Sequence, residues 1–174
     1  MIRAITLETE RLLLTALSRE HCSNSYVEWM NDQDIIKFLE TGGNYTIEKL
    51  DNFLLEQERK NILFWAIHIK DSKRHIGNIK IDPINYEDKS GEYGIMMGEK
   101  ASWGKGFAKE ASNRVIKYCF EDLKLCSITL GVIEDNINAI KLYKKIGFNI
   151  TKRIKDLGTY DNKLCNSLRM SLYA

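Results

Sequence analysis

The segment Trp103-Gly104-Lys105-Gly106-Phe107-Ala108 decides how this sequence is interpreted. It follows a predicted strand, Glu92–Met97, and precedes apolar residues that recur at helical spacing from Ala108 to Leu123. Glycines at a helix start let a ligand approach the backbone closely, and the unpaired N–H groups and helix dipole there attract negative charge. The segment therefore predicts a phosphate-binding turn.

Two familiar phosphate-binding motifs do not fit these residues. The dinucleotide-binding fingerprint needs a glycine or alanine at the position that Lys109 occupies. The P-loop needs Ser or Thr after its Gly-Lys pair, whereas Lys105 is followed by Gly106. A helix start whose glycines serve only the backbone geometry stays open as an alternative without a ligand.

A second informative segment lies further along the chain and reads Asn136-Ile137-Asn138-Ala139-Ile140-Lys141-Leu142-Tyr143-Lys144-Lys145-Ile146-Gly147-Phe148. Asn136 is predicted to cap a helix that carries Tyr143. Gly147 can end that helix in the left-handed conformation, and Phe148 then begins a strand. Taken alone, a tyrosine at position 143 would more often be an aromatic residue of the core.

The predicted elements indicate a mixed α/β fold whose central strands form an antiparallel meander. In chain order they are strand Arg11–Leu17, a helix from Ser18 to Trp29 with Ser18 as its N-cap, a loop at Thr41-Gly42-Gly43-Asn44, a helix after Thr46, strands Ile62–Ile69, Ile76–Ile81 and Glu92–Met97, helix Ala108–Leu123, strand Ile128–Ile133, helix Ala139–Ile146, and strands Phe148–Ile154 and Leu164–Leu172. The strand Ile76–Ile81 is expected to end at Asp82-Pro83, because proline cannot donate to the ladder. This order lacks the strict βαβ alternation of a doubly wound sheet.

The two segments together resemble the GNAT superfamily of N-acetyltransferases. Met97–Ala111 is similar to its coenzyme A motif, Gln/Arg-x-x-Gly-x-Gly/Ala, with Trp103 in place of the Gln or Arg. An aromatic residue followed by Gly-Lys-Gly, with Glu110 further on, is similar to the subgroup of ribosomal-protein N-terminal acetyltransferases (RimJ/RimL type). The resemblance covers roughly Ile62 to the C-terminus, and the first sixty residues match only loosely. It implies a mostly antiparallel sheet that splays at the acetyl-CoA site, with helices on both faces.

The resemblance also implies roles for particular residues. Tyr143 would protonate the departing thiolate, and Glu92 would accept the amine proton directly or through water. A strand N–H would polarise the thioester carbonyl. The strand backbone would bind the pantetheine, the turn amides would hold the pyrophosphate, and Asn136 would cap its helix or contact the pantetheine. The predicted acetyl-CoA-binding residues are Ile95, Met96, Met97, Trp103, Gly104, Lys105, Gly106, Phe107, Ala108, Lys109 and Asn136.

The acceptor amine is left open by the sequence. An amino sugar and a protein N-terminus rank above a polyamine, and Asp32 and Asp34 are candidate contacts for an amine. A direct transfer needs no nucleophilic cysteine and no metal. The alternative functions are an acyl-CoA-binding regulatory module without catalysis and a domain that binds ATP or NAD.

The composition indicates one globular domain, residues 1–174, with 44% hydrophobic and 29% charged residues. A net charge of +2 is too small to favour nucleic acid as a partner. No apolar run is long enough to span a membrane, and no secretory signal is recognised, so a cytoplasmic location is expected. The three histidines and four cysteines show no metal-ligand spacing, so no metal is predicted. A homodimer is one assembly that we consider.

Overall fold

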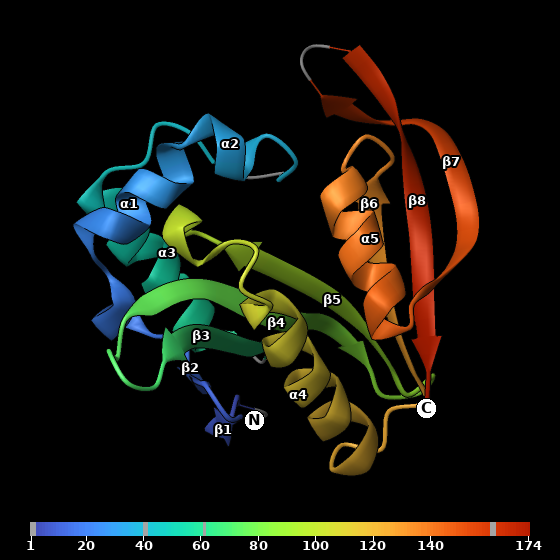
Figure 1. The fold of residues 1–174 in the computed structure, drawn as a ribbon, viewed down its shortest axis with the longest axis horizontal. Helices are drawn as coiled ribbons and strands as arrows, with labels where there is room; N and C mark the ends of the chain where they lie inside the picture. Colours follow the sequence, from blue (N-terminus) through green and yellow to red (C-terminus); the bar gives the residue numbers. More distant parts are fainter. Residues whose placement is uncertain (1–2, 40–41, 61, 161–162) are drawn as a thin grey trace.

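A computed structural model describes residues 3–39, 42–60, 62–160 and 163–174 (Figure 1). Thr41, part of a predicted loop, lies outside the described residues. The strands are β1 (Leu7–Glu8), β2 (Leu12–Ala16), β3 (Leu63–Ile69), β4 (His75–Asn85), β5 (Ser90–Met97), β6 (Ser127–Ile133), β7 (Asn149–Tyr160) and β8 (Lys163–Tyr173). The helices are α1 (Asn24–Asn31), α2 (Gln33–Ile36), α3 (Ile47–Arg59), α4 (Phe107–Glu121) and α5 (Ile137–Ile146), with 3₁₀ turns η1 (Arg19–His21) and η2 (Lys100–Ser102).

The strands of the described chain form one sheet in the order β1-β2-β3-β4-β5-β6-β8-β7. Neighbouring strands are antiparallel except for β5 and β6, which pair in parallel. The predicted mixed α/β class and antiparallel centre are therefore confirmed.

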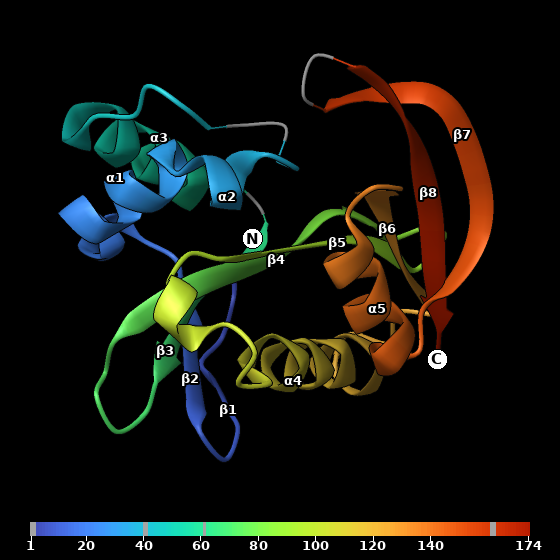
Figure 2. The same cartoon turned by 45° about the horizontal axis from the view of Figure 1, so that its top comes forward.

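Helices cover both faces of the sheet, as expected (Figure 2). Trp65 and Ile67 of β3 belong to the core beneath α4 and α5, whereas Ala66 between them belongs to a second core with α1 and α3. This alternation follows from the pleat, which points successive side chains to opposite faces. We call the two sides the α4–α5 face and the α1–α3 face.

The sheet opens between β5 and β6. The two strands are paired only from Ser90↔Ser127 to Glu92↔Thr129. Beyond Glu92, β5 continues with β4 as far as Met97, and β6 continues with β8. Figure 1 shows the two strands running apart. The splay predicted from the resemblance is thus present, and beyond Glu92 no strand of the described residues pairs with this edge of β5.

Several predicted boundaries differ from the structure. β4 does not end at Asp82-Pro83 but reaches Asn85, because a register shift between Ile81 and Ile84 accommodates the proline where the ladder with β5 is interrupted. Ser18 precedes η1, and it is Ser23 that caps α1 by accepting from the Tyr26 N–H at 3.2 Å. β7 extends to Tyr160, beyond the predicted end of that strand.

Candidate active site

The glycine turn before α4 presents a row of backbone donors. Gly104 and Gly106 have φ angles of 74° and 82°, the left-handed region that glycine adopts without strain. Within the described residues, no protein acceptor is recorded for the N–H groups of residues 104–109. Gly106 is the N-cap residue of α4 and offers no side chain to satisfy them. These donors and the positive end of the α4 dipole therefore remain available to an anion.

Trp103 connects this turn to the end of β5. Its indole Nε1 donates to the Met97 carbonyl oxygen at 2.9 Å, while 44% of the residue stays exposed. The Met97 carbonyl is thus already paired within the protein. Trp103 therefore fixes the turn relative to β5, a role that the motif comparison did not indicate.

The other predicted cofactor residues near the splay differ in the face of the sheet on which they lie and in their exposure to solvent. Ile95 and Met97 pack against the α4–α5 core, whereas Met96 packs on the α1–α3 side. Phe107 is buried, and the side chains of Lys105 and Lys109 are exposed. Ala108 accepts a hydrogen bond from Ser112 at 2.6 Å through its carbonyl oxygen, which keeps the first turn of α4 in place. The exposed lysines extend the positive potential of the turn.

Tyr143 lies in α5 on the α4–α5 face, and only 8% of it is exposed. Its ring meets Tyr93 of β5 edge-on at 5.7 Å and packs 6.0 Å from Phe148. Burial raises the pKa of Tyr143 to about 12, so the phenol keeps its proton at neutral pH. Asn136 caps α5 by accepting from the Ala139 N–H at 3.2 Å, and Gly147 ends the helix with φ at 119°, as predicted.

Glu92 is next to Tyr93 in β5, and its side chain therefore points to the α1–α3 face. Arg169 of β8 donates to its two carboxylate oxygens at 2.7 and 2.5 Å, and the Thr129 hydroxyl donates at 2.9 Å. Burial alone would raise the pKa of Glu92, but these hydrogen bonds outweigh it and hold the pKa below its usual value. This weakens Glu92 as a base, because a carboxylate with a low pKa takes up a proton less readily. Glu92 and Tyr143 flank the splay from opposite faces.

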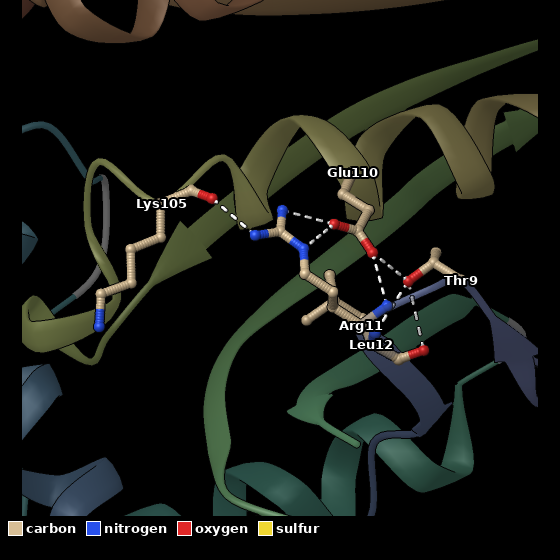
Figure 3. Close-up of polar contacts among 5 residues, drawn as sticks. All are labelled: Thr9, Arg11, Leu12, Lys105 and Glu110. Carbon is tan, nitrogen blue, oxygen red and sulfur yellow. Dashed lines mark hydrogen bonds and ion pairs between the residues drawn. The ribbon is translucent and has the colours of Figure 1, made fainter. Parts of the chain in front are cut away.

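A polar cluster that no sequence motif indicates joins Thr9 and Arg11 to Glu110 at the glycine turn (Figure 3). Arg11 Nε donates to Glu110 Oε2 at 2.7 Å, and Arg11 Nη1 donates to the Lys105 carbonyl oxygen at 3.1 Å. The Thr9 hydroxyl donates to Glu110 Oε1 at 2.6 Å. Glu110 is part of the segment that resembles the family motif, but no sequence pattern indicates that it contacts Thr9 and Arg11.

The acidic pair near α2 already has a cation. Lys100 Nζ lies 2.7 Å from a carboxylate oxygen of Asp32 and 2.7 Å from one of Asp34. The hydrogen bond from Lys100 is the main cause that lowers the pKa of Asp32. These two carboxylates were candidate amine contacts, and in this structure an amine of the protein itself lies between them.

The histidines, which are far apart in sequence, gather on the α1–α3 face. His21 Nε2 and His68 Nε2 are 3.2 Å apart, and the His75 ring lies 5.2 Å from each of the other two rings. A hollow of about 450 Å³ opens beside His21 and His68. Among the described residues, no group of three or more His, Cys, Asp or Glu side chains has the arrangement of a metal site. Over the same residues, no helix is both long and apolar enough to cross a membrane.

Comparison with known proteins agrees with this geometry. The profile of the acetyltransferase (GNAT) domain matches residues 11–149. The chain is 26% identical to the uncharacterized N-acetyltransferase p20 of Bacillus licheniformis over 96% of this chain and 95% of that one. It is 31% identical to the acetyltransferase PseH of Campylobacter jejuni over 74% of this chain and 78% of that one.

Among solved structures, the spermidine N-acetyltransferase of Vibrio cholerae in complex with CoA and spermine matches with a TM-score of 0.85. That match covers 95% of this chain and 96% of the other at 24% identity, a level at which it shows the shared fold. The chain belongs to the GNAT family of acetyltransferases and is an acyltransferase. The family match begins at residue 11, well before Ile62, where the sequence resemblance was placed.

Proposed function

We propose that this chain transfers the acetyl group of acetyl-CoA directly to a primary amine in a ternary complex. The observation that carries the proposal is the row of unpaired amides at residues 104–109, next to the unpaired edge of β5. A pyrophosphate fits the amide row, and an extended pantetheine fits an open strand edge as an added strand. Ile95 and the N–H of Met97 would offer their backbone to the pantetheine, because the Met96 carbonyl faces Gly77 of β4 and the Met97 carbonyl is bound by Trp103.

In the proposed reaction, the amine nitrogen attacks the thioester carbon, the C–N bond forms, and the C–S bond breaks with its electrons on sulfur. Tyr143 supplies a proton or a strong hydrogen bond to that sulfur. The pKa of about 12 makes its phenol a weaker acid than an ordinary thiol, whose pKa is about 8.5. Hydrogen bonding to the developing thiolate is therefore the main part of the role that we assign to Tyr143.

Glu92 would act on the acceptor amine from the other side of the splay. An alkyl amine with a pKa of about 10.4 is mostly protonated at neutral pH and must lose a proton before attack. Because Arg169 and Thr129 already bind the carboxylate, we assign Glu92 to orienting the amine or a water, and to only a minor share of proton removal. Two protons leave the nitrogen through that water, one before and one after attack. One passes to solvent, and the other balances the proton that the sulfur gains as the CoA thiol.

The charges on the α1–α3 face favour an acceptor with one amine over a polyamine. Glu92 is paired with Arg169, and Asp32 and Asp34 are both paired with Lys100. Carboxylates that are already neutralised by neighbouring cations offer little additional attraction to a polycation. This supports an amino sugar or a protein N-terminus as the acceptor. We also propose that the chain belongs to the RimJ/RimL-type subgroup and that it forms a homodimer.

Binding and turnover with a Gly106→Val variant test the proposal. The wild-type protein should bind CoA and should release thiol from acetyl-CoA when a mixed panel of amines is added. Gly106→Val should abolish CoA binding, because the side chain blocks the approach of the pyrophosphate to the backbone. Gly43→Val is the matched control, since Gly43 has a similar φ of 79° and lies in a loop on the other side of the sheet.

Three outcomes separate the alternatives. Normal CoA affinity in Gly106→Val would remove the pyrophosphate assignment. Tight CoA binding without an acetylated product from any amine would support the regulatory module. Protection against thermal unfolding by ATP or NAD, and not by CoA, would support the nucleotide-binding alternative.

A further inference from the structure

Arg11 contacts one residue of the glycine turn and two residues of the first turn of α4. Its Nη1 donates to the Lys105 carbonyl oxygen at 3.1 Å, and its Nη2 lies 2.6 Å from Glu110 Oε2. The guanidinium carbon is 4.5 Å from the centre of the Phe107 ring. Figure 3 shows the side chain extending between Lys105 and Glu110. One side chain from the N-terminal segment therefore spans the turn and the first turn of the helix.

The arginine is itself held in a defined position. Glu110 accepts from the Arg11 backbone N–H at 2.9 Å as well as from its side chain, and from the Thr9 hydroxyl at 2.6 Å. The Thr9 hydroxyl in turn accepts from the Leu12 N–H at 2.8 Å. Burial opposes the charge on Glu110, yet the hydrogen bonds from Thr9 and Arg11 prevail and lower its pKa. The carboxylate thus stays ionised and fixes the backbone and the side chain of Arg11 together.

The bond to Lys105 determines which way one amide of the turn points. A trans peptide is planar, with its C=O and N–H on opposite sides. When Arg11 binds the carbonyl of Lys105, the N–H of Gly106 must point away from Arg11. Gly106 has a φ of 82°, and glycine allows many other orientations of this peptide plane. Within the described residues, this is the one hydrogen bond to residues 104–106 from a distant part of the chain.

We propose that Arg11 is a positioning residue for the cofactor, which orients the Lys105–Gly106 peptide so that the Gly106 N–H faces the pyrophosphate of coenzyme A. This rests on the proposed function of the turn. The charge of Arg11 is matched by Glu110, so the residue acts through geometry more than through attraction. A lysine cannot replace it, because a single ammonium cannot bind Glu110 and Lys105 with the fixed fork of a guanidinium.

The experiment compares two ligands that differ in the pyrophosphate. Affinities for CoA and for pantetheine, which lacks the pyrophosphate and the nucleotide, are measured by calorimetry and by NMR titration. Arg11→Ala and Arg11→Lys should each weaken CoA binding about tenfold and leave pantetheine binding within about twofold. Arg11→Lys keeps the packing of the side-chain stem on Phe107, so it serves if Arg11→Ala does not fold.

Arg19→Ala is the matched control for losing an arginine ion pair. Arg19 binds Asp51 through Nε and Nη2 at 2.8 and 2.5 Å, and its side chain is 51% exposed, against 45% for Arg11. This variant should bind both ligands as the wild type does.

Several results would overturn the proposal. These are unchanged CoA affinity in both Arg11 variants, equal weakening for CoA and pantetheine, or wild-type CoA affinity in Arg11→Lys, which would indicate charge instead of position. If the wild-type protein itself failed to bind CoA, the proposed function would be wrong before the role of Arg11 came into question.

Discussion

Tyr93 and Glu92 are neighbours in β5 but lie on opposite faces of the sheet. Ionisable groups are buried and neutral on the face of Tyr93, and charged and ion-paired on the face of Glu92. On the α4–α5 face, Tyr93 bonds to Ser112 at 2.7 Å and packs against Tyr143. Burial there raises the pKa of Tyr143 and of Cys119 to about 12 each. On the α1–α3 face, Glu92 stays charged because Arg169 binds it.

The difference shows that one splayed strand can separate two chemical tasks. Burial keeps a proton on Tyr143, to which we assign the departing sulfur, and ion pairing keeps protons off Glu92, to which we assign the acceptor. Each group is stable in its charge state at neutral pH. The cost is that neither is a strong acid or a strong base, so positioning and hydrogen bonding carry more of the expected catalysis.

The largest effect should come from the buried face. Tyr143→Phe removes the hydroxyl and keeps the ring that packs on Tyr93 and Phe148. We expect kcat to fall about 100-fold, with the affinity for CoA unchanged, because the hydroxyl acts on charge that develops only in the transition state. Steady-state kinetics with CoA calorimetry measure both quantities. An unchanged kcat would show that the Tyr143 hydroxyl takes no part in the reaction. The two faces would then not serve separate steps.

The next effect concerns pH and the α1–α3 face. Burial, with His21 and His68 nearby, lowers the pKa of His75 from 6.5 to about 4. Between these values the unfolded chain binds more protons, so stability present above pH 6.5 is lost as the pH falls towards 4. The full shift corresponds to about 3 kcal/mol, and we expect about 2 kcal/mol because the side chain keeps some contact with solvent.

Urea unfolding at about pH 7 and about pH 5 tests this loss, with His75→Gln as the comparison. Glutamine does not titrate, so its free energy of unfolding should change less with pH than that of the wild type. Parallel losses in the two proteins would place the acid sensitivity elsewhere on the molecule.

The smallest effect should come from Glu92→Gln. The amide keeps the shape of the carboxylate but loses its charge, and kcat/KM should fall about tenfold or less, because the ion pair already weakens Glu92 as a base. The measurement is kcat/KM of Glu92→Gln and of the wild type, determined with an amine acceptor over a range of pH. A loss as large as that of Tyr143→Phe would make Glu92 the main base and would break the comparison between the faces.

The sequence by itself determined the features that depend on local geometry. Glycines at 104 and 106 adopt positive φ before a helix, Asn136 caps α5, and Gly147 ends it. Such turns and caps are fixed by residues close together in the chain, and so their pattern is visible without a structure. The mixed α/β class followed from the periodicity of the strands and helices. Elements as short as β1 and α2 carry too few residues to show a period.

Only the tertiary structure decided which distant residues meet. Arg11 reaches Glu110, Arg169 neutralises Glu92, Lys100 occupies the acidic pair, and the histidines converge. The Arg169–Glu92 pair depends on strand order and register, because a shift of one residue would turn each side chain to the other face. The contacts of Arg11 and Lys100 depend on how the helices and turns pack on the sheet. Local pattern therefore located the glycine turn, whereas the charge state of Glu92 and of the acidic pair on the α1–α3 face was set by contacts that no spacing in the sequence encodes.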